Sequence, residues 1–294
     1  MAAINFSPRR ADTFSVETLP RPRPPLVLPP FAPIPELDMV AYGRMAREVQ
    51  LLLGIDLSRY RPAQVWRRVN GFAAARGMLG ADELVIRVRQ DAALRQAFLD
   101  MLTINVSEFF RNPEAWAALA DQHLRPMFRS QAPVRIWSAG CSLGFEPFSI
   151  AMLAREIAPF AVVEILATDV DETSLSKARK ATFTEAQMAG VSPTRKRRFF
   201  RHTEGKWHVR PEIQAPITFR RQDLVTDPCG GPFDIVVCRN VVIYFTEQAK
   251  TDLYGRFHDC LRPGGILFLG ATEVIPSARS FGLLPAGSSF YKRP

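Results

Sequence analysis

The sequence predicts an α/β fold in which a small helical subdomain precedes a larger domain built on a parallel β-sheet. Apolar residues recur at helical spacing from about residue 38 to 128. From Val134 onward, short apolar runs alternate with helical stretches, a rhythm typical of a parallel sheet covered by helices. We therefore divide the chain into residues 1–36, 37–128 and 129–294.

The first segment, residues 1–36, is predicted to be a disordered tail. Nine of the chain's 24 prolines lie within residues 1–35. Proline has no backbone N–H and contributes nothing to a hydrogen-bonded ladder, so such a stretch stays extended. We interpret the segment as a passive tail, with a docking role as the alternative.

The helical subdomain is predicted from its end signals. Asp38 is suited to cap a helix that closes at Gly54. Pro62 stands where a first-turn proline belongs in a second helix, and Gly77 follows that helix. Arginines flank the apolar stripe of this second helix, and a solvated face explains them as well as a binding surface does.

Five strands are expected in the larger domain, each a short apolar run between helical stretches. Between about residues 183 and 216 this rhythm breaks, and two short runs flank Glu204-Gly205, a pair suited to a tight turn. We predict a small antiparallel insert there. The five expected strands are residues 134–138, 163–168, 217–221, 233–238 and 265–270.

The composition restricts the class of partner and the compartment. A net charge of +9 favours an anionic partner, which is a nucleic acid, a membrane surface or an acidic protein. The sequence holds no zinc-finger or RNP signature, so we expect no nucleic-acid partner. It also has no signal-peptide pattern and no apolar run of about 18 residues. A cytoplasmic protein without membrane insertion, and a monomer by default, is expected.

The four cysteines are predicted to be reduced. They show no CxxC spacing and no accompanying histidine cluster, which argues against a metal site and against a disulfide framework. They are Cys141, Cys229, Cys238 and Cys260.

A ligand site is predicted where the first strand runs into residues 138–144. Gly140 and Gly144 there allow a close approach of the backbone, but their spacing matches neither a P-loop nor a dinucleotide fingerprint. Asp169 ends the second strand, where a carboxylate is suited to accept ribose hydroxyls, with a helix N-cap as its alternative role. Asn240 follows a later strand and offers an amide, unless it bonds its own backbone.

From about residue 37 to its end, the chain resembles the CheR family of chemotaxis receptor methyltransferases. The resemblance rests on several motifs in the right order. One reads LTINVSEFFRN and ends at Asn112, and another reads CRNVVIYF and begins at Cys238. The matching segments are residues 54–68, 102–112, 135–142, 166–171, 238–245 and 261–273.

The resemblance implies an all-α subdomain followed by a Rossmann-like S-adenosyl-L-methionine-dependent methyltransferase domain, and it implies residue roles. Arg111 would orient the reacting carboxylate, although an ion pair with Glu108 or Glu114 is the structural alternative. Asp169 would bind ribose and Glu146 would lie near the amino group of the cofactor. The implied cofactor-binding residues are Asn105, Ser107, Arg111, Glu146, Asp169, Asn240 and Val241, and the implied receptor-docking residues are Arg59, Arg61, Arg67 and Arg68.

The sequence departs from the family in its glycine loop. Leu143, Phe145 and Phe148 stand where the family usually has Thr, Glu and Tyr. The loop thus lacks a hydroxyl, a carboxylate and a phenol, but it keeps both glycines and Glu146. We expect cofactor binding to persist.

The implied activity is methyl esterification of glutamate side chains on a chemoreceptor. Glutamate is already ionised at neutral pH, so the reaction needs no general base, and alignment of the reacting atoms is the main task of the site. Two alternatives are kept: a catalytically weakened, cofactor-binding regulatory or scaffold protein, and a methyltransferase for another acidic protein.

Overall fold

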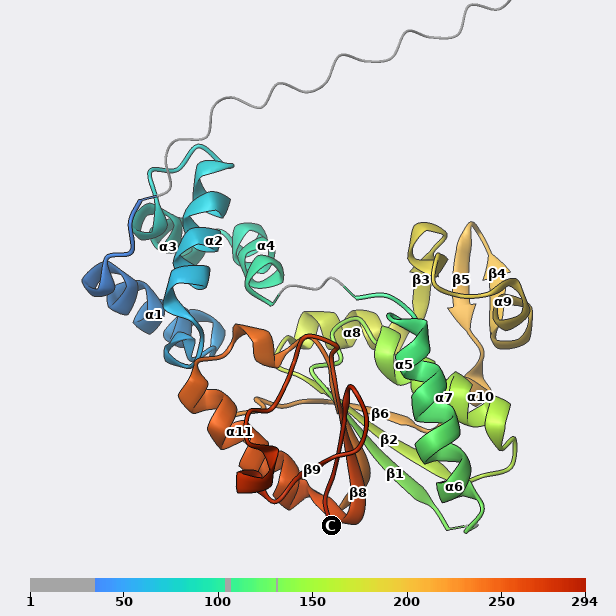
Figure 1. Ribbon diagram of the computed structural model, residues 1–294. Helices are drawn as coiled ribbons and strands as arrows, with labels where there is room; N and C mark the ends of the chain where they lie inside the picture. The colour runs from blue at the N-terminus through green and yellow to red at the C-terminus, as the bar shows by residue number, and fades with distance from the viewer. Residues whose placement is uncertain (1–34, 104–106, 131) are drawn as a thin grey trace, which may run out of the picture. The chain divides into compact units, whose positions relative to one another are not determined.

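The computed structural model describes residues 35–103, 107–130 and 132–294 (Figure 1). Nearly all of the predicted tail and the predicted cofactor-binding residue Asn105 lie outside the described residues, so both stay predictions. Within the described residues, no helix combines the length and the apolar character needed to cross a bilayer.

The helical subdomain has the predicted end signals. The Asp38 side chain accepts the N–H groups of Val40 and Ala41, and Gly54 ends the first helix at a φ of 71°. Pro62 opens the second helix. The helices are α1 (Met39–Leu53), α2 (Pro62–Ala74), α3 (Ala81–Gln90) and α4 (Ala92–Leu102), with a short 3-10 turn at Leu57–Arg59. Their shared core includes Met45, Val69, Leu84 and Phe98.

The larger domain is built on one main sheet. Among the described residues, seven strands lie in the order β6-β2-β1-β7-β8-β10-β9. The first five are parallel to one another and confirm the five predicted strands, whereas β10 and β9 were not predicted and pair antiparallel. The strands are β1 (Val134–Ala139), β2 (Val163–Asp169), β6 (Ile217–Arg221), β7 (Phe233–Cys238), β8 (Leu261–Leu269), β9 (Leu284–Pro285) and β10 (Phe290–Lys292).

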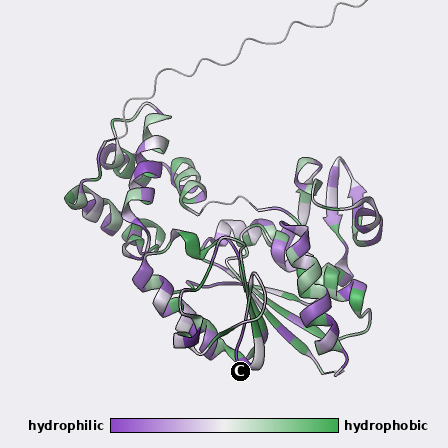
Figure 2. Cartoon of the chain, viewed as in Figure 1, coloured by the Kyte–Doolittle hydropathy of each residue, from purple (hydrophilic) through white to green (hydrophobic). Residues whose placement is uncertain are grey.

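Helices cover both faces of this sheet, because alternate residues of a strand point to opposite sides. Ile136 packs into the core on the side of α7 (Phe145–Ile157). Its neighbour Trp137 packs into the core on the side of α11 (Glu247–Cys260). Figure 1 shows α7 and α11 on opposite sides of the strands, and Figure 2 shows hydrophobic residues along the central strands.

Further helices complete the two layers. Trp116 places α5 in the same core as α7. These helices are α5 (Pro113–Ala118), α6 (Arg125–Phe128) and α8 (Glu172–Lys180), with a π-helical turn at Leu119–Leu124 between the first two and 3-10 turns at Val242–Tyr244 and Ala278–Phe281.

The order of the strands fixes where a ligand binds. The chain goes from β1 outward to β2 and β6, then returns to β7 on the other side of β1. In open α/β sheets, such a reversal opens a crevice beyond the carboxyl ends of the two central strands. The predicted glycine loop follows β1, and Asn240 follows β7, so both lie at this crevice.

The antiparallel insert is confirmed. Its strands lie in the order β3-β5-β4, and Glu204 and Gly205 form the turn with φ values of 52° and 71°. The insert comprises β3 (Thr182–Thr184), a 3-10 turn at Ala186–Met188, α9 (Pro193–Phe199), β4 (Phe200–Thr203) and β5 (Lys206–Val209), and α10 (Pro211–Gln214) follows it.

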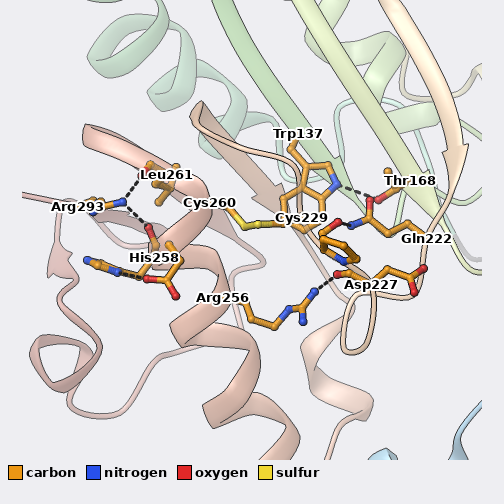
Figure 3. Close-up of a disulfide and its surroundings, with 12 residues drawn as sticks. Trp137, Thr168, Gln222, Asp227, Cys229, Arg256, His258, Cys260, Leu261 and Arg293 are labelled. Atoms are coloured by element: carbon orange, nitrogen blue, oxygen red, sulfur yellow. Dashed lines mark hydrogen bonds and ion pairs between the residues drawn. A yellow bond between two sulfur atoms is a disulfide. The ribbon is translucent and has the colours of Figure 1, made fainter.

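The prediction that all cysteines are reduced is wrong for one pair. Cys229, in the loop before β7, forms a disulfide with Cys260 at the end of α11 (Figure 3). The two lie 31 residues apart, so their spacing gave no signal. Gly231 permits the approach, since a Cβ there would overlap the backbone oxygen of Cys260. Cys141 and Cys238 are free and buried.

Candidate active site

A pocket lies at the carboxyl ends of β1, β2, β6 and β7. It brings together most of the residues predicted from sequence that the structure describes. Leu57 and Arg68 of the helical subdomain also line it. The predicted residues in its wall are Ser107, Arg111, Glu146, Asp169, Asn240, Val241 and Arg68.

Asp169 ties the end of β2 to the glycine loop. One carboxylate oxygen accepts the N–H of Ser142 at 2.8 Å and the other accepts the N–H of Asp171 at 3.0 Å. Burial raises the pKa of Asp169, while these backbone bonds oppose the rise. The alternative role as a helix N-cap is wrong, because Asp171 caps α8 by accepting the N–H of Thr173. A carboxylate has about four acceptor positions, so Asp169, which lines the pocket, retains acceptor capacity for a ligand.

Glu146 is a partly buried carboxyl group in the pocket wall. The hydroxyl of Ser138 donates to it at 2.7 Å. Burial raises the pKa of Glu146 to about 7, although the nearby Arg239 guanidinium favours the ionised form. The Glu146 carboxyl group therefore changes charge near neutral pH, and a cationic ligand group would stabilise its ionised form.

Arg239 is a pocket residue that sequence reasoning missed. Its side chain is only 8% exposed and lies against the rings of Trp116 and Phe268. It donates to the backbone oxygen of Arg111 at 2.8 Å and to Oδ1 of Asn112 at 3.1 Å. Its Nε is buried and has no hydrogen-bond partner in the part of the chain that the structure describes. The available signal was its place after β7, directly before Asn240.

Arg111 is held by its backbone while its guanidinium faces the pocket. Both neighbours have a positive φ, 52° at Phe110 and 59° at Asn112, a strained arrangement that persists only where the surroundings impose it. Trp116 and Arg239 both donate to the carbonyl of Arg111. Within the described residues its guanidinium forms no ion pair, so the structural alternative, a bond to Glu108 or Glu114, is not found.

The segment after β7 supplies three further pocket residues. Asn240 has a φ of 60° and lines the pocket. Its side-chain amide makes no hydrogen bond to any described residue, so it does not bond its own backbone. Val241 packs close to Gly140, because a Cβ at position 140 would lie 2.7 Å from the Val241 side chain. Tyr244, which sequence reasoning missed, lines the pocket near Arg68 and Arg111, and burial raises its pKa.

A third missed feature is the wall formed after β6. Gln222, Asp223 and Leu224 line the pocket there. Asp223 accepts the N–H of Val225 at 2.8 Å, which shapes the loop. No motif in the sequence pointed to this loop.

The four arginines predicted to dock a receptor differ in their surroundings. Arg59 pairs with Asp56 and Asp252, and Arg61 pairs with Glu247. Arg67 is exposed, whereas Arg68 lines the pocket and donates to the backbone oxygens of Leu102 and Met101. Of these arginines, Arg59 and Arg61 therefore pair with α11, whereas Arg67 is open to a partner.

The three departures in the glycine loop lie outside the pocket wall. Phe145 and Phe148 are each 1% exposed and pack into the core behind the loop. The ring of Phe145 meets those of Phe109 and Phe183 with centroids 4.9 Å away. Leu143 packs against the same core. These side chains replace polar groups with apolar packing and do not line the space beside Gly140.

Comparison with known proteins decides the family. The model described as "CheR methyltransferase, SAM binding domain" matches residues 105–288, and "CheR methyltransferase, all-alpha domain" matches residues 41–103. The chain belongs to the CheR methyltransferase family. S-adenosyl-L-methionine is accordingly its cofactor, and the predicted family and fold are confirmed.

Curated relatives agree with this assignment. A "Chemotaxis protein methyltransferase" of Listeria monocytogenes is 37% identical over 88% of this chain and 98% of its own length. "Chemotaxis protein methyltransferase 1" of Pseudomonas aeruginosa is 36% identical over 76% of this chain and 85% of its own length. A solved TehB-like SAM-dependent methyltransferase of Corynebacterium glutamicum is 17% identical, with a TM-score of 0.34. The match covers 62% of this chain and 93% of that one, and the likeness is too low to support an inference.

The aromatic packing behind the glycine loop predicts the result of restoring the usual family residue. Phe145→Glu is expected to lower the free energy of unfolding by about 3 kcal/mol or more, because it removes a core aromatic and buries a carboxylate without a partner. Denaturant unfolding measures this, with Phe145→Leu as the apolar control. A Glu variant as stable as wild type would show that the loop packs differently.

Proposed function

We propose that this protein transfers the methyl group of S-adenosyl-L-methionine to glutamate side chains in the cytoplasmic part of a chemoreceptor, forming γ-glutamyl methyl esters. The observation that carries the proposal is Arg111: its guanidinium faces the pocket without an ion-pair partner among the described residues. A guanidinium is matched to a carboxylate, and Arg111 stands beside the groups that suit the cofactor.

The pocket fits the amino-acid end of the cofactor. That end carries an ammonium and a carboxylate, and the pocket offers one group of each opposite sign. The Glu146 carboxyl group would hold the ammonium, and Nε of Arg239, which has no partner among the described residues, would donate to the carboxylate. Asp169 would accept ribose hydroxyls with its free lone pairs. Once bound, the cofactor supplies a methyl group on a positively charged sulfur.

The residues on the acceptor side orient a carboxylate and need not move a proton. A glutamate has a reference pKa of about 4.3 and enters already ionised. Arg111 stays protonated and cannot act as a base, so its task is to hold the incoming carboxylate by a charge-assisted bond of about 1.5–3 kcal/mol. Arg68 and Tyr244 line the same pocket and would exclude water from the reacting atoms.

The proposed docking of an acidic receptor is supported by charge. The chain carries +9, and its relatives bear the name chemotaxis protein methyltransferase. Arg67 is open to a partner and Arg68 leads into the pocket, so these two support the docking proposal best. Arg59 and Arg61 would first have to leave their carboxylate partners on α11.

Mass spectrometry tests the proposed activity directly. The purified protein is incubated with S-adenosyl-L-methionine and a chemoreceptor cytoplasmic domain, and receptor peptides are mapped. We expect a mass gain of one methyl group on glutamates, lost on treatment with base. Absence of base-labile methylation from every receptor domain tested, with cofactor binding intact, would favour the cofactor-binding scaffold instead.

The role of Arg111 predicts a split between turnover and cofactor affinity. Arg111→Ala is expected to lower turnover by about 10- to 100-fold through loss of one charge-assisted bond. The dissociation constant for S-adenosylhomocysteine, measured by calorimetry, should change by less than about threefold. Arg129→Ala, at an exposed position, is the control. Turnover equal to that of the control would remove Arg111 from the reaction.

The raised pKa of Glu146 predicts that cofactor affinity depends on pH. Only the ionised carboxylate attracts the ammonium group, and the pKa of Glu146 is about 7. Affinity for S-adenosylhomocysteine should therefore fall about tenfold as pH is lowered from about 7.5 to about 5.5, while both ligand charges persist. Calorimetry across this range measures it. Glu146→Gln should bind more weakly with a flat profile, and parallel profiles for the two proteins would contradict the assignment.

A further inference from the structure

Glu273 lies in the loop after β8 and has no role in the site described above. It is 4% exposed, and its carboxylate forms no ion pair within the described chain. A buried carboxylate without a cation is costly unless several donors satisfy it. The hydrogen-bond donors around the Glu273 carboxylate therefore indicate its structural role.

The donors are backbone N–H groups from two neighbouring strand ends. Oε2 accepts from Asn240 at 2.7 Å and from Gly270 at 2.8 Å. Oε1 accepts from Ile243 at 3.4 Å, and Val242 adds a further backbone N–H. One carboxylate thus fastens the segment after β7 to the end of β8.

Gly270 makes room for this contact. A Cβ at position 270 would lie 2.6 Å from Oε2 of Glu273 and 3.1 Å from the backbone nitrogen of Asn240. An alanine there would push the carboxylate and its donors apart. Gly270 and Glu273 therefore act as one unit.

The fastened segment presents pocket residues. Asn240, Val241 and Tyr244 line the pocket, while the N–H groups of Asn240 and Ile243 point away to Glu273. Asn240 has a φ of 60°, which a residue with a side chain adopts at a cost. Bonds to the carboxylate offset that cost and fix which way the Asn240 amide faces.

The chemistry of the contact requires the ionised carboxylate. Among the described residues, every hydrogen-bond partner of its oxygens is an N–H donor. A neutral carboxylic acid or an amide would bring a hydrogen atom of its own against one of these donors. Burial raises the pKa of Glu273, and the backbone bonds oppose the rise.

We propose that Glu273 is a positioning residue that holds the Asn240–Tyr244 segment so that Asn240, Val241 and Tyr244 face the cofactor and the acceptor carboxylate. Glu273 touches neither substrate nor cofactor and acts through that segment. The inference rests on the proposed function for its effect on methyl transfer, and on the cofactor pocket alone for its effect on binding.

Two variants test it by different means. Glu273→Gln removes the charge, and Gly270→Ala displaces the carboxylate while keeping it. Each should lower kcat by about 100-fold, the scale of a misplacement of about 1 Å, and weaken S-adenosylhomocysteine binding by about tenfold. Glu212→Gln, at an exposed carboxylate on α10, is the matched control and should change neither value. Circular dichroism and binding stoichiometry establish the folded fraction.

The double variant separates positioning from general loss of stability. If both changes break the same contact, Glu273→Gln combined with Gly270→Ala should be no worse than the poorer single variant in kcat and affinity. Folded single variants that keep wild-type kcat and affinity, or effects that multiply in the double variant, would overturn the proposal. Affinity needs no acceptor protein, so a wild type that methylates no receptor glutamate would refute the proposed function and leave this test intact.

Discussion

The site depends on one constraint: an arginine is buried at the end of β7, and no carboxylate of the described residues is bound to it. Arg239 lies against the rings of Trp116 and Phe268 and donates to the backbone oxygen of Arg111. A guanidinium cannot lose its charge in a protein, so this burial stays costly until a ligand satisfies the remaining Nε. The same side chain fixes Arg111 and favours ionisation of Glu146. Under the proposed function, cofactor recognition and acceptor orientation would therefore both depend on Arg239.

The helical subdomain contributes to the same arrangement through the chain segment that precedes α2. The N–H of Arg61 donates to the carbonyl of Tyr244 at 2.9 Å, and the N–H of Thr246 donates to the carbonyl of Arg59 at 2.8 Å. Tyr60 and Phe245 pair between them, with ring centroids 4.9 Å apart. The segment that bears Tyr244 is thus held on both sides, by Glu273 and by residues 59–61.

Much of the fold could be predicted from local patterns, whereas the contacts that complete the site could not. Apolar periodicity and end signals such as Asp38 and Gly54 located the first two helices and the five parallel strands, and strand-end positions pointed to Asp169 and Asn240. The role of Arg239 depends on its contact with Arg111, which lies 128 positions away, and that of Glu273 on donors 30 and 33 positions away. Contacts between residues so far apart in the sequence cannot be predicted from residue spacing. The same reason hid the Cys229–Cys260 disulfide, and only packing shows that Phe145 and Phe148 fill the core.

A crystal structure with S-adenosylhomocysteine and a glutamate-bearing receptor peptide would show what Arg239, Glu146 and Arg111 bind. We expect the ligand carboxylate within hydrogen-bond distance of Nε of Arg239, the ammonium at Glu146 and the peptide glutamate at Arg111. A ligand whose amino-acid end lies elsewhere, with Nε of Arg239 still unpartnered, would contradict this expectation.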